Sequence, residues 1–204
     1  MITGRPFAAV GVKMNRNWED ISYLKNGSDR QRKAYDTLRK TGIFTGLNAF
    51  SPILAGTIPI EIYLPESDLD IICEVNDVPL FRKTVCRLYS GYDGFSGNEI
   101  GNVFIVSFNC NDFRIEIFAK PMPVKEQEAY RHMIVEYRLL KLFGEPFRKE
   151  IIRTKSEGLK TEPAFCKILG IKGDPYRSLL KLENCSDDDL LRIFGTRMQI
   201  CHVR

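Results

Sequence analysis

The sequence lacks the patterns that mark several common classes of protein. Its six cysteines are scattered and, with only two histidines, they form no CxxC pair and no zinc-finger spacing. No apolar run approaches the roughly 20 residues that span a bilayer. Neither sign of charge dominates, since 30 Lys and Arg stand against 26 Asp and Glu. These absences argue against a zinc ribbon, a membrane protein and a dedicated nucleic-acid domain, and they favour a cytoplasmic protein with free thiols.

The composition that remains is that of a globular chain of 204 residues, 44% of them hydrophobic, which is enough to bury a core. We expect an N-terminal extension (1–27), an α/β core (28–120) and a helical lobe (121–204). The fold class is α/β (α+β), with a small mixed sheet and flanking helices. The expected strands are 52–55, 69–75, 102–108 and 113–118, and the expected helices are 29–41, 78–88, 124–143 and 146–157, with three short helices starting near Thr161, Asp174 and Ser186.

Two carboxylates share one face of the expected strand 69–75. Asp68 and Asp70 alternate with Leu69, so both project to the side opposite the core. A cation between such acids relieves their repulsion, and hard oxygen ligands favour Mg²⁺. Glu116 lies on the polar face of another alternating strand and is a candidate third ligand. The alternatives are exposed acids at a strand start, and an ion pair of Glu116 with Arg114.

Gly56 and Thr57 follow a short apolar strand, ten residues before the acids. A glycine there permits close approach of the backbone, and exposed N–H groups beside a hydroxyl can hold phosphates. An ordinary turn is the alternative interpretation.

The expected helix 124–143 carries a polar face with Glu128, His132 and Glu136 at intervals of four residues, next to Arg131. This face is either solvated and salt-bridged, or it directs Arg131 or His132 to a nucleotide or acceptor. The basic residues that follow indicate a solvated helix surface more than a cleft lining; they are Arg148, Lys149, Arg153, Lys155 and Lys160. The acids 187–189 indicate helix capping rather than a metal site.

These residues resemble the signature of the polymerase-β-type nucleotidyltransferase superfamily: a small hydrophobic residue, Gly, then Ser or Gly, a gap of roughly ten residues, Asp-hydrophobic-Asp and a later acid on an adjacent strand. Thr57 stands here at the position where Ser is commoner. Further segments resemble an uncharacterised, mostly bacterial nucleotidyltransferase-like family, over about residues 30–182. They are 48–60 (NAFSPILAGTIPI), 67–73 (SDLDIIC), 129–133 (AYRHM), 160–165 (KTEPAF) and 173–176 (GDPY).

The resemblance implies an enzyme that moves a nucleoside monophosphate from an NTP, most simply ATP, to an acceptor hydroxyl. It implies that Asp68, Asp70 and Glu116 are catalytic and hold Mg²⁺ or Mn²⁺. The residues implied to bind the nucleotide are Gly56, Thr57, Ser67, Arg114, Arg131 and His132. We expect a small-molecule acceptor, because no recognisable RNA-binding segment follows the helical half. The modest net charge also disfavours a nonspecific nucleic-acid binder. A catalytically silent nucleotide-binding or regulatory module of the same fold is the alternative.

Overall fold

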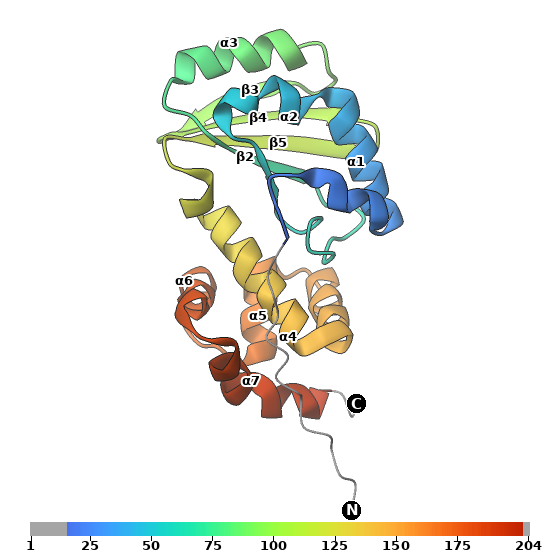
Figure 1. The fold of residues 1–204 in the computed structure, drawn as a ribbon, viewed down its shortest axis with the longest axis vertical. Helices are drawn as coiled ribbons and strands as arrows, with labels where there is room; N and C mark the ends of the chain where they lie inside the picture. The colour runs from blue at the N-terminus through green and yellow to red at the C-terminus, as the bar shows by residue number, and fades with distance from the viewer. Residues whose placement is uncertain (1–15, 202–204) are drawn as a thin grey trace, which may run out of the picture. The chain divides into compact units, whose positions relative to one another are not determined.

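The computed structural model describes residues 16–201 of the chain, with side chains through residue 198. Residues 1–15 of the expected N-terminal extension, and the end of the chain from residue 202, lie outside the described part. The described chain contains two compact units, one of Asn17–Ile134 and one that begins at Val135 (Figure 1). Within it, no helix is both long and apolar enough to cross a bilayer.

The first unit is built on a five-stranded mixed sheet. The strands are β1 (Ile53–Ala55), β2 (Leu69–Glu74), β3 (Ser96–Ile100), β4 (Val103–Cys110) and β5 (Phe113–Lys120). Their order across the sheet is β1-β2-β5-β4-β3, and β2 and β5 run parallel while every other neighbouring pair is antiparallel. The strands β2 and β5, which lie far apart in the sequence, are therefore neighbours within the sheet.

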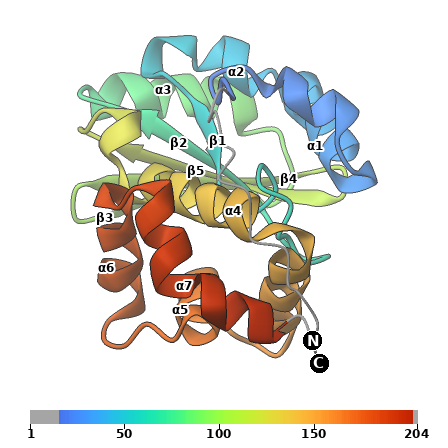
Figure 2. The same cartoon turned by 60° about the horizontal axis from the view of Figure 1, so that its bottom comes forward.

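One face of the sheet is covered by α1 (Asp29–Thr41), α2 (Ile43–Gly46) and α3 (Val78–Tyr89) (Figures 1 and 2). The unit also contains the short 3₁₀ helices η1 (Ile21–Asn26), η2 (Asn48–Phe50) and η3 (Val124–Glu126). Alternate strand residues such as Leu69, Ile71 and Ile115 pack with apolar residues of α1 and α3 in one core. Because side chains alternate along a strand, the residues between them face the other side of the sheet.

Local signals explain where the elements begin and end. The Ser28 side chain accepts a hydrogen bond from the Gln31 N–H, and the Gln31 Oε1 accepts one from the Ser28 N–H, so the two residues form a capping box at the expected start of α1. Gly42 ends α1 in the left-handed conformation (φ 64°). Asn111, with φ 51°, lies in the tight turn of the β4–β5 hairpin.

Two parts of the first unit are not anticipated by the sequence pattern. β3 pairs with β4 through its backbone, but all five of its residues are exposed, so it carries no apolar alternation. The segment Ile21–Asn26 forms η1 and buries Ile21 and Leu24 against the core. Main-chain pairing and a short 3₁₀ helix leave little trace in the pattern of hydrophobic residues.

The second unit is helical. It contains most of α4 (Glu128–Ser156), then α5 (Thr161–Leu169), α6 (Pro175–Leu180), η4 (Lys181–Asn184) and α7 (Asp187–Cys201). Edge-to-face rings of Phe143, Phe147 and Phe165, with centroids 5.3 and 5.6 Å apart, join the two halves of α4 to α5.

α4 is interrupted where two separate helices were expected. Gly144 has non-helical dihedral angles (φ 74°, ψ −164°), two residues before Pro146. Proline disfavours helical geometry in the residue before it and cannot donate the next hydrogen bond, so the helix bends here and restarts. Asp174 caps α6 as expected, and Ser186 and Asp189 cap the start of α7.

Helix α5 begins at Thr161, near the expected position, but without a capping side chain. Lys160 holds the N-cap position and makes no side-chain capping bond, while Thr161 is the first helical residue. Pro163 lies in the first turn, where a missing N–H costs nothing. The proline therefore starts this helix without help from a capping side chain.

Candidate nucleotide and metal site

The centre of the sheet places two acids directly opposite each other. In the parallel pair β2 and β5, the Cα register partner of Asp70 is Glu116. Leu69 and Ile71 are buried in the core, whereas Asp68 and Asp70 are half-buried on the other face. The alternation expected for both strands is confirmed, and it brings Asp68, Asp70 and Glu116 to the side of two neighbouring strands that faces away from the core.

A row of hydroxyl groups continues from these acids across the sheet. Ser107 of β4 is the register partner of Glu116, and Ser96 of β3 is the partner of Ser107. The two serine oxygens are 2.9 Å apart, and Ser107 also accepts a hydrogen bond of 3.1 Å from the Arg114 guanidinium. A row of polar side chains therefore runs across this face of the sheet from Asp70 to Ser96 of β3. Ser107 belongs to this row and was not among the predicted site residues.

The turn after β1 lies against the Asp70 carboxylate. Ala55, the last residue of β1, is the register partner of Asp70, and Gly56 follows with φ +75°. A Cβ built on Gly56 would lie 2.2 Å from the Asp70 Oδ2 atom. Only glycine fits this position without a shift, because it must both adopt a positive φ and let the backbone approach a carboxylate.

The loop from Gly56 to Asp68 folds back on itself. The Ser67 hydroxyl accepts hydrogen bonds from the Thr57 hydroxyl (3.4 Å) and from the Leu64 N–H (2.9 Å). The Arg30 guanidinium of α1 donates to the Ser67 carbonyl oxygen at 3.3 Å. These contacts hold the predicted nucleotide-binding residues Gly56, Thr57 and Ser67 next to the strand that carries the acids.

Arg114 and Glu116 form an ion pair on the polar face of β5. The Arg114 Nε donates to Glu116 Oε1 at 2.9 Å, with the arginine side chain 52% and the glutamate side chain 24% exposed. Such a partly exposed pair is weak, and a divalent cation or a phosphate competes with it for either partner. The all-carboxylate donor set and the cradle at Gly56 fit a hard divalent cation such as Mg²⁺.

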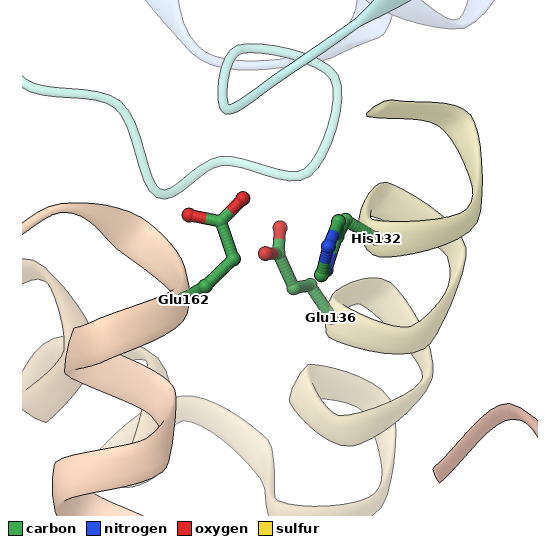
Figure 3. A group of neighbouring side chains, drawn as sticks. All are labelled: His132, Glu136 and Glu162. Carbon is green, nitrogen blue, oxygen red and sulfur yellow. The ribbon is translucent and has the colours of Figure 1, made fainter. Parts of the chain in front are cut away.

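Arg131 and His132 lie on α4. Arg131 is half-buried, and His132 is only 6% exposed. His132, Glu136 and Glu162 each offer one ligand atom, and these atoms lie within 4.8 Å of one another (Figure 3). The structure therefore associates His132 with two glutamates that were not among the predicted site residues.

The solvated interpretation of this face of α4 is wrong at its centre. Glu136 is 4% exposed, and burial, with a further contribution from Glu162, raises the pKa of Glu136 well above its ordinary value of 4.5. The positive charge of Lys155 lowers the pKa of Glu136 and so opposes that rise. Lys155 itself is only 6% exposed, so the expectation that it lies on a solvated helix surface is wrong. The spacing of His132 and Glu136 by four residues was the available signal, but nothing in the sequence identified Glu162 as the third member.

A cavity of about 720 Å³ opens elsewhere in the first unit. Its lining includes Ile53, Glu74 and Lys125. Glu74 is four residues beyond Asp70 along β2, about 13 Å at the usual rise of a strand. The cavity therefore lies at the other end of β2 from the Gly56 turn and contributes nothing to the proposed nucleotide site.

Comparison with solved structures shows which class of fold this is. A mutant of the Cid1 poly(U) polymerase bound to MgATP matches 78% of this chain and 53% of its own, with 13% identity and a TM-score of 0.50. The GLD-2/RNP-8 complex (89% and 72% covered, 15% identity, TM-score 0.49) and a cytoplasmic RNA terminal U-transferase (75% and 46%, 15% identity, TM-score 0.47) also match. The fold is that of the polymerase-β-type nucleotidyltransferases.

The chain spans about half the length of two of these three structures. Its residues 36–182 match the family model described as Domain of unknown function (DUF4269), and the chain belongs to that family. No curated protein matches it. The expectation of a nucleotidyltransferase fold within an uncharacterised family is confirmed.

Proposed function

We propose that the protein is a metal-dependent nucleotidyltransferase that moves a nucleoside monophosphate from an NTP to an acceptor hydroxyl. The observation that carries the proposal is the placement of Asp70 opposite Glu116 in adjacent parallel strands, with the Gly56 turn against Asp70. Two acids and a glycine turn at one place are what binding of a metal–triphosphate requires.

Asp68, Asp70 and Glu116 would hold Mg²⁺ or Mn²⁺. Such ions, when bound, neutralise the charge that develops on the reacting phosphate and on the leaving pyrophosphate. The Gly56 turn and the hydroxyls of Thr57 and Ser67 bind the phosphates of the NTP, which we propose to be ATP.

The charged side chains near the acids have separate tasks. When the nucleotide binds, the Arg114 guanidinium leaves its ion pair with Glu116 and pairs with a phosphate oxygen instead. The Glu116 carboxylate is then no longer held by Arg114. Glu116 then accepts the proton of the acceptor hydroxyl as its oxygen bonds to the α-phosphorus and pyrophosphate leaves. We assign Arg131 to the nucleotide as well, since a guanidinium suits phosphate oxygens.

We propose a small molecule as the acceptor. The net charge of +4 is small for a protein that grips a polyanion. The names of two of the matched structures specify poly(U) and RNA ends, but this chain covers only about half of each of those two proteins. The turnover experiment below distinguishes a small-molecule acceptor from an RNA acceptor.

The proposal is tested first by thermal unfolding with each of the four NTPs, with and without Mg²⁺. A ligand that binds only the native state adds about 2.7 kcal/mol to the free energy of unfolding at a hundredfold excess over its Kd. We expect a rise in Tm that needs both nucleotide and Mg²⁺ and that is lost in Asp68→Asn/Asp70→Asn. Asp36→Asn, an exposed acid on α1, is the control and keeps the shift.

Turnover is tested by pyrophosphate release from the stabilising NTP with a panel of small hydroxyl compounds and RNA oligonucleotides. Release with a small acceptor supports the proposal, and release with RNA alone contradicts its acceptor. The ion pair between Arg114 and Glu116 favours a second candidate, a silent nucleotide-binding module, because one acid is already neutralised. Stabilisation without release in any arm would establish that second candidate.

A further inference from the structure

A second set of metal-binding side chains lies in α4 and α5, apart from the acids assigned to nucleotidyl transfer. His132 and Glu136 are four residues apart and so lie one turn apart on the same face of α4. Glu162 comes from the first turn of α5. Figure 3 shows the two carboxylates directed toward each other with the imidazole beside Glu136. The boundary between the compact units falls after Ile134, but the continuous helix fixes His132 relative to Glu136.

Burial makes this arrangement of charges unfavourable as it stands. His132 is 6% and Glu136 is 4% exposed, and Glu162 is half-buried. The buried Lys155 places one positive charge near Glu136, against two carboxylates. With both acids ionised and the imidazole neutral, these four side chains carry a net charge of −1, which a bound cation or a proton would neutralise.

We propose that His132, Glu136 and Glu162 form a binding site for a divalent transition-metal ion, of which Zn²⁺ is the reference. The imidazole nitrogen selects transition metals over Mg²⁺ and Ca²⁺, and the two carboxylates supply charge. Three protein ligands leave one position of a tetrahedral ion for water.

The ligand atoms are already near the spacing that such an ion needs. They lie within 4.8 Å of one another, and ligand atoms around one Zn²⁺ are about 3.4 Å apart. Rotation of the Glu162 side chain, which is half-buried, can close the difference. Because Glu136 and Glu162 come from different helices of the same unit, the ion joins α4 to α5, and its binding free energy adds to the stability of that unit.

The experiment uses the full chain carrying Asp68→Asn/Asp70→Asn, so that Zn²⁺ bound at the proposed catalytic acids does not contribute. The protein is stripped with a chelator and titrated with ZnCl₂ by calorimetry, with Tm measured at each ratio. We expect one equivalent of Zn²⁺ and a rise in Tm that MgCl₂ at the same concentration does not produce. Co²⁺ at the site gives visible absorption that is lost in His132→Gln.

Two substitutions of Glu162 separate a ligand from a structural residue. Glu162→Gln removes the charge, and Glu162→Asp keeps the charge but shortens the reach. We expect both to weaken Zn²⁺ binding more than about tenfold, with the metal-free Tm of Glu162→Asp unchanged. Glu157→Gln, an exposed acid near the end of α4, is the matched control and leaves binding unchanged.

The proposal is overturned if no equivalent of Zn²⁺ binds in this background, or if binding survives both Glu162→Gln and His132→Gln. A proton shared by Glu136 and Glu162 would then be the neutralising charge. The result is independent of the proposed nucleotidyl transfer: failure to bind or turn over NTP leaves the Zn²⁺ titration unaffected, and loss of Zn²⁺ binding leaves the NTP experiments to stand alone.

Discussion

Gly56 links the backbone of the β1 turn to the chemistry of Asp70. Its φ of +75° strains any other residue, and an added Cβ would meet the Asp70 Oδ2 atom at 2.2 Å. We expect Gly56→Ala to lower the free energy of unfolding by about 1–3 kcal/mol and to abolish the Tm shift with NTP and Mg²⁺, because Asp70 must move. Chemical denaturation and the nucleotide thermal shift measure the two effects.

Gly101 is the matched control for that substitution. It also has a positive φ of +61°, but nothing lies within 4 Å of its added Cβ. Gly101→Ala therefore carries the backbone strain of about 1 kcal/mol without the contact, and we expect it to keep the nucleotide shift. Equal nucleotide shifts in both variants would show that the Gly56 turn plays no part in binding.

The cysteines differ in reactivity according to their burial. Burial raises the pKa of the Cys73 thiol on β2 to about 12, while Cys86 on α3 is exposed. Since the thiolate is the reactive form, we expect iodoacetamide at mildly alkaline pH to modify Cys86 in the native protein and to leave Cys73 intact until denaturant is added. Mass spectrometry of peptides before and after unfolding checks this, and native labelling of Cys73 would contradict the core packing of β2.

At the scale of elements, helix caps offer a contrast within one chain. Ser28 completes a capping box at α1 and also accepts a hydrogen bond from the Tyr63 hydroxyl at 3.0 Å, whereas Lys160 at the N-cap of α5 makes no capping bond. We expect Ser28→Ala to lower the free energy of unfolding by about 1 kcal/mol and Lys160→Ala to leave it within about 0.5 kcal/mol. Denaturant titration of both variants measures the difference, and similar losses would mean that the box contributes little to α1.

The sequence predicts those strands in which apolar and polar residues alternate, because the alternation shows which side of the strand is buried. Leu69–Glu74 and Phe113–Lys120 alternate between core and polar face, so β2, β5 and the face carrying Asp70 and Glu116 could be predicted. β3 could not, because an edge strand exposed on every residue is specified by main-chain pairing alone.

The polar face of α4 shows the opposite failure. His132 and Glu136 look like solvent-facing residues by type, but both are buried in the folded chain. Helical periodicity indicates which residues share a face and does not indicate what covers a polar face. The third member, Glu162, lies 26 residues after Glu136 in sequence, so only tertiary structure could bring it into the group.

At the scale of the whole molecule, the polar groups of functional interest fall into two sets with different electrostatics. The acids of β2 and β5 are half-buried and lie among hydroxyls and an arginine, where ions and nucleotides can exchange. Glu136 is enclosed with Glu162 and Lys155, so its charge state is coupled to folding of the chain rather than to solvent. A measurement of global stability against pH therefore reports on this second set.

Replacement of Glu136 by glutamine should remove one component of that pH dependence. Burial and Glu162 raise the pKa of Glu136 in the folded state above its ordinary value of 4.5, so between that value and the raised pKa the folded chain holds a proton that the unfolded chain has lost. The contribution is therefore fully present below about pH 4.5, and it falls by up to about 1.4 kcal/mol per pH unit as the pH rises toward the folded pKa.

The measurement is urea denaturation of wild type and Glu136→Gln across this pH range, with chelator present so that no metal is bound. We expect the wild type to lose stability relative to Glu136→Gln as the pH rises, because glutamine holds the neutral form at every pH. Titrating groups that do not interact with Glu136 cancel in the difference between the two proteins. A difference that does not change with pH would mean that Lys155 keeps Glu136 ionised in the fold, and the negative charge left for a cation would then reside on Glu162.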